Sequence, residues 1–376
     1  MYEFILLLPL CILIYYFLKW IVNNRYQIAA YFVAMSDLRW RLNNRPIGRD
    51  FREIIDNILQ NRFDDSPYQL FVNDGEGRGV VMVAGGKYAK RAFQSVQKLR
   101  QNGCQLPVQI FYLGADELPK LLLYDFENTE FHDIRADCPE IKGWPAKAYA
   151  IARSKFAEVL FLDADNEPLQ NPEQLFDLEC YQSTGAIFWP DFFLIGHSSK
   201  VFWVNRYLFP KSVAKYLQME HKLYQQESGQ ILIDKKRHVQ PLLALLYLNA
   251  KSDVIYKYLF GDKDTFQIAW ALCNHPSFMV QPPPDFGGTY IDGDFIPLSM
   301  LQKHPDNGTS MFMHYTLQKN LTSGIIPKVT HIQLHANPNG DIPTPRNKVY
   351  NKSLFYYWVL QGEIVPFVSP DKNFGL

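Results

Sequence analysis

Two aspartates with one residue between them, Asp163 and Asp165, directly follow the apolar run Val159-Leu-Phe-Leu. Alternate side chains of an extended chain point the same way, so both carboxylates can face one ligand. Carboxylates this close repel each other unless a cation or hydrogen bonds compensate. A divalent cation that also holds a diphosphate would supply that compensation. The pattern therefore predicts a nucleotide-sugar site in which Asp163 and Asp165 are metal ligands.

The apolar run itself is typical of a strand that is buried on both faces, and ligands of open α/β sheets bind at the carboxyl ends of such strands. Earlier strands are expected at 80–84, 108–112 and 131–134, with helices between them. This alternation predicts an α/β fold with a mainly parallel, Rossmann-like sheet flanked by helices. Ala84 and Gly85 end the first strand, where phosphates meet the start of the next helix, and are expected to contact the nucleotide.

Composition describes a globular protein with a large core. The chain has 376 residues, 47% of them hydrophobic and 20% charged, and its formal net charge is zero. A neutral chain gives no reason to expect a nucleic acid as partner. The five cysteines show neither a CxxC pair nor the spacing of a zinc site.

The first residues have the character of a membrane anchor. Residues 4–22 are apolar except for Lys19, and this length is enough to span a bilayer. No small-residue cleavage site follows. We therefore expect an uncleaved single-pass transmembrane signal anchor at 1–25, a stem at 26–75 and a catalytic domain at 76–376.

The orientation of this anchor is left open by the residues around it. Lys19 and Arg25 follow the span, and positive charges there favour a cytosolic catalytic domain. Sequons at Asn307, Asn320 and Asn351 favour the lumen instead.

The segment around the two aspartates resembles a known family. Residues 147–168, read as KAYAIARSKFAEVLFLDADNEP, are similar to the metal-binding core of GT-A glycosyltransferases, and in particular to the fungal Golgi α-mannosyltransferases of glycosyltransferase family 71. The resemblance extends from about 79 to 321. Four later blocks follow in the order of that family: GAIFWPD at 185–191, ESGQILIDK at 227–235, GDKDTF at 261–266 and MHY at 313–315.

This resemblance implies a type II membrane enzyme with a luminal, Golgi catalytic domain. It would move mannose from GDP-mannose to a glycan acceptor with retention of configuration, assisted by Mn²⁺. GT-A enzymes often take a third metal ligand from far along the chain, which points to His314, with His331 and His335 as rivals. A mixed carboxylate and imidazole site suits Mn²⁺ better than Mg²⁺. The same comparison implies that Lys147 faces the donor and that Lys319 reaches its diphosphate.

Four further carboxylates are candidates for the reaction itself. Asp191 follows an apolar strand and could accept hydrogen bonds from sugar hydroxyls, or it could cap a turn or helix that begins at Phe192. Asp264 could serve as the N-cap of the helix after it. A retaining transfer needs no strong general base, because the leaving phosphate can take the acceptor proton while a carboxylate stabilises the cationic sugar. Glu227, Asp262 and Asp264 are candidates for that carboxylate, and the sequence does not choose among them.

Three rival functions remain to be weighed. Phosphatases of the haloacid dehalogenase type also carry Asp-x-Asp, but on the first strand and followed by a threonine, and neither feature occurs here. A retaining GT-A transferase that uses UDP-glucose or UDP-galactose would need the same two aspartates. A non-catalytic, glycan-binding membrane protein would need no complete metal site.

Overall fold

The computed structural model describes residues 48–62, 72, 74–194, 208, 224–281, 283–316, 328–335, 344–350, 353–359 and 363–367. The chain divides into two units, residues 1–52 and 53–376, and helix α3 (Arg49–Leu59) crosses that boundary. The predicted anchor at 4–22 lies outside the described residues. Within the described ranges no helix has the length and apolar character needed to cross a bilayer.

Seven strands of the described chain form the main sheet, in the order β3-β2-β1-β4-β7-β6-β8. β7 is antiparallel to both of its neighbours, and the remaining pairs are parallel. The predicted mixed, mainly parallel sheet is therefore confirmed. The strands are β1 (Arg78–Val83), β2 (Val108–Tyr112), β3 (Thr129–Asp133), β4 (Glu158–Leu162), β6 (Ala186–Leu194), β7 (Tyr224–Asp234) and β8 (Phe278–Met279).

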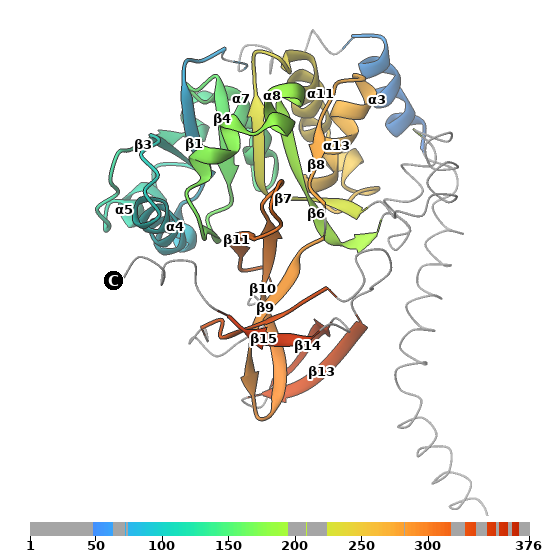
Figure 1. The fold of residues 1–376 in the computed structure, drawn as a ribbon. Helices are drawn as coiled ribbons and strands as arrows, with labels where there is room; N and C mark the ends of the chain where they lie inside the picture. Colours follow the sequence, from blue (N-terminus) through green and yellow to red (C-terminus); the bar gives the residue numbers. More distant parts are fainter. Residues whose placement is uncertain are drawn as a thin grey trace, which may run out of the picture. The chain divides into compact units, whose positions relative to one another are not determined.

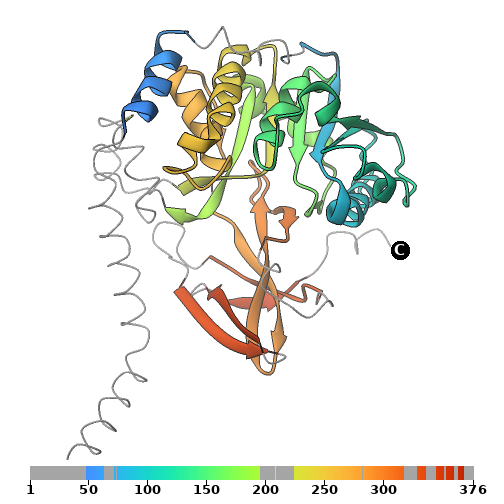
Figure 2. The same ribbon diagram turned by 180° about the vertical axis from the view of Figure 1, so that it is seen from behind.

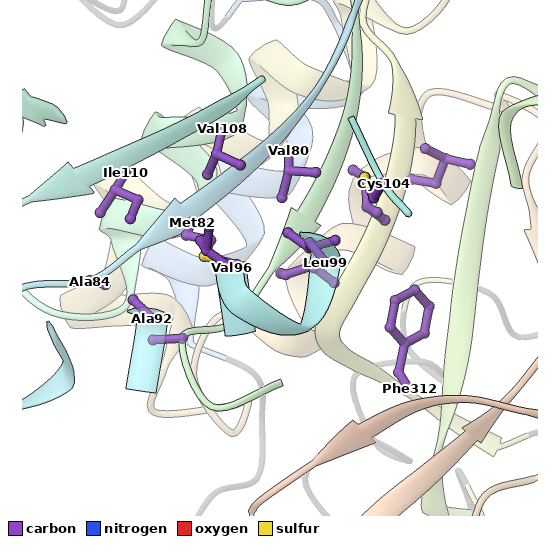
Figure 3. Packing of buried hydrophobic residues seen from close by; sticks show 14 of the residues in the cluster. Val80, Met82, Ala84, Ala92, Val96, Leu99, Cys104, Val108, Ile110 and Phe312 are labelled. Carbon is purple, nitrogen blue, oxygen red and sulfur yellow. The ribbon is translucent and has the colours of Figure 1, made fainter. Parts of the chain in front are cut away.

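One face of the main sheet is covered by helix α4 (Ala89–Gln101). Val80 and Met82 point to this face because side chains alternate along β1, and they share a buried cluster with Val96 and Leu99 of the helix (Figure 3). The regular spacing of these apolar residues explains why both elements were predictable. Gly103 follows the helix in the left-handed conformation (φ +84°), as expected for a C-terminal cap.

The opposite face carries three helices, α7 (Pro145–Arg153), α11 (Val239–Ala250) and α13 (Lys263–Leu272). Figures 1 and 2 show the sheet between these helices and the elements of the α4 side. Phe188 of β6 meets Trp270 of α13 edge to face, with ring centroids 5.3 Å apart. The sheet is thus buried on both faces, as the apolar strands predict.

A second, antiparallel sheet is attached to the first through the residues that follow the two aspartates. Its order is β15-β12-β9-β10-β11-β5, and β5 (Asn166–Pro168) begins one residue after Asp165. β5 pairs with β11 (Ser310–His314), so that His314 lies opposite Asn166. The other strands are β9 (Asp285–Ile291), β10 (Asp294–Lys303), β12 (His331–Gln333) and β15 (Ile364–Pro366).

Some elements are shorter or longer than predicted. The helix expected near 116–124 is only one turn, α5 (Leu118–Leu121), and the chain turns again from Leu122. The strand expected at 230–233 begins six residues earlier, at Tyr224 of β7. Small elements complete the described chain: η2 (Gly86–Tyr88), α6 (Ile134–Asp137), η3 (Pro172–Asp177), α8 (Glu179–Thr184), α12 (Ser252–Ile255), β13 (Thr344–Tyr350) and β14 (Ser353–Val359).

Candidate active site

Asp163, Asp165 and His314 meet where the two sheets join. The Nε2 atom of His314 lies 3.2 Å from Oδ1 of Asp165 and 3.6 Å from Oδ2 of Asp163. One ligand atom from each residue falls within 4.8 Å of the other two. The rivals His331 and His335 do not join this group. His331 lies on β12 and pairs with Gly288 of β9, and the backbone N–H of His335 donates to the Asp285 carboxylate.

A glycine on β7 makes this close approach possible. The Gly229 carbonyl accepts hydrogen bonds from the Asp163 N–H at 2.8 Å and from the Asn166 side-chain amide at 2.7 Å. A Cβ atom at Gly229 would lie 2.2 Å from Nδ1 of His314, well inside van der Waals contact. Any larger residue would therefore push β11 away from the aspartates.

Lys147 of α7 supplies a buried positive charge beside the aspartates. Its Nζ lies 3.0 Å from Oδ1 of Asp163 and 3.2 Å from Oδ2 of Asp262, and it donates to the Ser228 carbonyl at 2.9 Å. Burial opposes the charge on the amine, but the charges of Asp163 and Asp262 outweigh it and raise the pKa of Lys147. Lys147 therefore stays protonated and links the predicted metal ligands to Asp262.

A second buried ion pair joins Asp191 of β6 to Lys263 of α13. The other Asp191 oxygen accepts a hydrogen bond from the Phe192 N–H at 2.6 Å. No helix or turn begins at Phe192, since β6 continues to Leu194, so the alternative reading of Asp191 as a helix or turn cap is wrong. Sequence reasoning gave Lys263 no role. Its place between two acids in Asp-Lys-Asp was a signal that this lysine lies among carboxylates, but its partner Asp191 comes from a distant segment.

Glu227 lies next to the histidine of the cluster. Its Oε1 atom is 3.6 Å from Nδ1 of His314 and accepts a hydrogen bond from the Gly229 N–H at 2.9 Å. Burial raises the pKa of Glu227, the positive charge of His314 lowers it and the negative charge of Asp191 raises it further, and the net direction is upward. Glu227 is thus oriented toward the imidazole and not toward solvent.

Asp264 does not have the capping role that its position suggested. Helix α13 begins at Lys263, so the residue at the N-cap position is Asp262, and Asp264 lies in the first turn. Asp264 is 4% exposed, and burial raises the pKa of its carboxyl to about 6. Its Oδ2 atom has no hydrogen-bond partner among the described residues.

The turn at Ala84 and Gly85, predicted to contact the nucleotide, has the acidic side chain of Glu117 packed against it. Ala84 is buried, and its N–H donates to the Phe111 carbonyl at the end of β2. A Cβ atom on Gly85 would lie 2.2 Å from Oε2 of Glu117, so the Glu117 carboxylate packs directly on this glycine. Lys319, the predicted diphosphate contact, lies outside the described residues.

The ligand atoms present fit a divalent metal. Two carboxylates and one imidazole form a mixed oxygen and nitrogen set, which suits Mn²⁺. Metal-bound histidines commonly direct their second ring nitrogen toward a carboxylate. Nδ1 of His314 has Oε1 of Glu227 at 3.6 Å, which is longer than a hydrogen bond.

Comparison with known proteins identifies a family. Residues 77–294 match a protein-family model described as a mannosyltransferase. The chain is 31% identical over 268 residues to the α-1,2-mannosyltransferase MNN21 of Candida albicans, covering 56% of this chain and 39% of that protein. It is 29% identical over 324 residues to the α-1,2-mannosyltransferase MNN5 of Saccharomyces cerevisiae, covering 69% and 54% respectively. The chain thus spans between 39% and 54% of the length of these relatives.

Solved structures give only loose superpositions. The glycosyltransferase GlyE of Streptococcus pneumoniae is 14% identical, with a TM-score of 0.35, over 55% of this chain and 46% of that one. Mouse xyloside xylosyltransferase 1 is 15% identical, with a TM-score of 0.36, over 55% of this chain and 85% of that one.

Proposed function

Since the chain belongs to the mannosyltransferase family whose model it matches over 77–294, we propose that it transfers mannose from GDP-mannose to a glycan acceptor. Transfer would proceed with retention, giving an α-mannosidic bond, and would depend on Mn²⁺. The observation that carries this proposal is the cluster of Asp163, Asp165 and His314, with the buried amine of Lys147 at its side.

The cluster has the chemistry that a nucleotide-sugar donor requires. Asp163, Asp165 and His314 would hold the ion, which when bound neutralises the charge of the leaving diphosphate. Lys147 adds a fixed positive charge next to Asp163, held in place by Asp262 and the Ser228 carbonyl. Such preorganised charge stabilises a leaving group without any rearrangement during the reaction.

Retention of configuration at C1 of mannose means that the new bond forms on the same face of the sugar as the bond that breaks. The bond from C1 of mannose to the diphosphate oxygen breaks, a bond from C1 to the acceptor oxygen forms on the same face of the sugar, and the acceptor proton leaves on the diphosphate. Asp191, fixed by Lys263, would accept hydrogen bonds from mannose hydroxyls. Glu227, Asp262 and Asp264 remain the candidates to stabilise the positive charge that develops on the ring. Glu227 is favoured because it is the one that lies beside His314.

We further propose a type II membrane placement with a luminal, Golgi catalytic domain. Its support is the apolar run at 4–22, and the opposing charges of Lys19 and Arg25 make a direct test necessary. Glycosylation of the sequons at Asn307, Asn320 or Asn351, read as a mobility shift that glycosidase reverses, would support a luminal domain. Sensitivity of the catalytic domain to protease added to sealed microsomes would contradict it.

The donor can be identified by a panel assay on the full chain. GDP-mannose, UDP-glucose, UDP-galactose and UDP-N-acetylglucosamine are incubated with Mn²⁺, and nucleotide release is measured with and without an α-mannoside acceptor. We expect turnover of GDP-mannose and its loss on chelation of the metal. Turnover of a UDP-sugar would overturn the mannose assignment and keep the site. Binding of glycan without turnover of any donor would favour a non-catalytic glycan-binding protein.

Alanine variants then test the cluster itself. Asp163→Ala and Asp165→Ala should each abolish transfer, because removal of either carboxylate removes a metal ligand, while the thermal unfolding of each variant shows that it is folded. The exposed Asp253 of α12 supplies the matched control, Asp253→Ala. Full activity in both cluster variants would exclude the metal site.

A further inference from the structure

Two large aromatic side chains are exposed beside the Lys147–Asp262 ion pair. Trp144 is 63% exposed and Phe260 is 53% exposed, the largest values among the aromatic residues whose side chains the structure describes. Each belongs to the local segment of one partner in the ion pair. Trp144 lies one turn before Lys147 at the start of α7, and Phe260 lies two residues before Asp262.

The two segments are packed together at a glycine. A Cβ atom on Gly261 would lie 2.8 Å from the Trp144 ring, so the backbone between Phe260 and Asp262 rests directly against the indole. Gly261 also has φ +83°, a conformation that favours glycine. Below this contact the Lys147 amine and the Asp262 carboxylate are 3.2 Å apart. The indole of Trp144 therefore lies against the backbone segment that carries both Phe260 and Asp262, next to the ion pair of the candidate active site.

A ligand that covers the exposed rings of Trp144 and Phe260 would gain binding free energy from their burial. Burying an aromatic ring removes a large apolar area from water. Tyr256 covers part of the indole, with ring centroids 5.8 Å apart, yet most of its surface remains exposed. Lys142 and Lys257, which lie close to Trp144 and Tyr256 in the sequence, are exposed as well. Two exposed rings make a small apolar surface. A protein helix or a membrane would need a larger apolar area.

A sugar ring matches a surface of this kind. One face of a pyranose presents C–H groups, and their positive hydrogens are attracted by the negative face of an aromatic ring. The hydroxyl groups at the edge of the sugar stay in water or bind the surrounding polar groups. We propose that Trp144 and Phe260 form an acceptor subsite, on which a mannoside ring of the acceptor glycan stacks. This inference rests on the proposed function, because it assigns the acceptor to the rim of the same site.

The test separates acceptor binding from donor chemistry. The full chain carrying Trp144→Ala, Phe260→Ala or Trp144→Phe is assayed with GDP-mannose, Mn²⁺ and an α-mannotriose. We expect each alanine variant to raise the KM for the acceptor by about tenfold, with the KM for GDP-mannose and the acceptor-free hydrolysis unchanged. Trp144→Phe retains a ring and should recover most of the acceptor affinity. Tyr290→Ala, an exposed aromatic of β9, is the control and should change none of these values.

Three results would overturn the acceptor subsite. An unchanged acceptor KM in both alanine variants would exclude stacking, and a raised KM for GDP-mannose would assign the rings to the donor. A loss in Trp144→Ala that Phe260→Ala does not share, together with a lower melting temperature, would show that Trp144 only supports Gly261. Binding of α-mannotriose by calorimetry gives a readout without turnover. If the wild-type chain transfers no mannose but binds this glycan through Trp144 and Phe260, the proposed reaction fails while the subsite stands.

Discussion

His314 is brought to Asp165 across 149 residues of sequence, by the pairing of β11 with β5. We predict that His314→Ala raises the Mn²⁺ concentration for half-maximal activity by at least about tenfold, because one of three protein ligands is lost. A titration of GDP-mannose turnover with Mn²⁺ measures this. His331→Ala is the control, since that histidine lies on β12 away from the cluster. Equal metal requirements in His314→Ala and in the wild-type chain would contradict the assignment.

Variants of the Asp191–Lys263 ion pair can separate its contribution to stability from its contribution to activity. Removing one partner of a buried ion pair leaves the other uncompensated, so Lys263→Met is expected to lower the free energy of unfolding by about 3–5 kcal/mol. The double variant Lys263→Met with Asp191→Leu should recover most of this loss, because both charges are gone. Urea unfolding of both single variants and the double variant measures the coupling.

Activity distinguishes the role of Asp191 from its contribution to the fold. The stable double variant should still transfer no mannose, because the carboxylate that would bind the sugar hydroxyls is absent. Strictly additive losses of stability would show that the two side chains are not coupled. Transfer at the wild-type rate in the double variant would remove Asp191 from the donor site.

At the scale of elements, regular strands and helices could be predicted and the elements around the site could not. β1, β4 and α4 bury apolar residues at the spacing of their secondary structure, so the pattern is visible in the sequence. β7 begins with Tyr-Gln-Gln-Glu-Ser-Gly, and β6 continues through Pro190 and Asp191. Buried polar residues and a proline argue against a central strand when only the sequence is read. Some of these polar groups are paired inside the fold: Lys263 contacts Asp191 and Gln225, and Lys147 donates to the Ser228 hydroxyl.

Helix α7 holds Lys147 near its start and is anchored at its end by a second buried lysine. The amine of Lys235 donates to the carbonyls of Ala152 at 3.2 Å and Ser154 at 2.6 Å, where the helix ends. Burial lowers the pKa of Lys235 to about 7, and the nearby charge of Asp74 only partly offsets this effect. The unfolded chain, with an ordinary lysine pKa, therefore binds a proton that the folded protein does not bind between pH 7 and about 10.4.

This difference predicts a pH dependence of stability with a defined sign. The free energy of unfolding should rise with pH across that window, by up to about 1.4 kcal/mol per pH unit from Lys235, and the contribution should be flat below pH 7. Lys235→Met should lose this slope, although the loss of two hydrogen bonds lowers its stability overall. Chemical unfolding from pH 6 to pH 10 compares the two proteins, with the exposed Lys236→Met as control. Parallel curves would show that Lys235 is charged in the folded state.

At the scale of the whole catalytic unit, the site lies where β4 of the main sheet leads into β5 of the second sheet, and its histidine comes from β11, far along the chain. The resemblance of 147–168 to a mannosyltransferase family is confirmed by the family match, and it suggested His314 among three histidines. The pairing of β5 with β11 and the packing of His314 on Gly229 bring this histidine to the aspartates, and both depend on contacts far apart in sequence. Lys263 was missed for the same reason, because its partner Asp191 lies 72 residues away.

Because the proposed metal ligands lie at the ends of strands from both sheets, metal binding should stabilise the two sheets together. A ligand that binds only the folded state stabilises it by about 2.7 kcal/mol at a concentration 100 times its dissociation constant. We predict that Mn²⁺ with GDP raises the melting temperature of the wild-type chain in a single transition. Hydrogen exchange should slow in β4 of the main sheet and in β11 of the second sheet. Protection confined to one sheet would contradict a site shared between them.

The carboxylates should have opposite effects on stability with and without the ion. Without metal, Asp163 and Asp165 carry like charges close together, with Lys147 beside Asp163 and His314 beside Asp165. Asp165→Asn should therefore unfold at the wild-type temperature or slightly above it in chelator, and should lose the rise caused by Mn²⁺ and GDP. Asp253→Asn, on the exposed surface of α12, should keep the full rise. A rise of equal size in Asp165→Asn would mean that the ion binds elsewhere, whereas a large loss of stability in chelator would make Asp165 a structural residue.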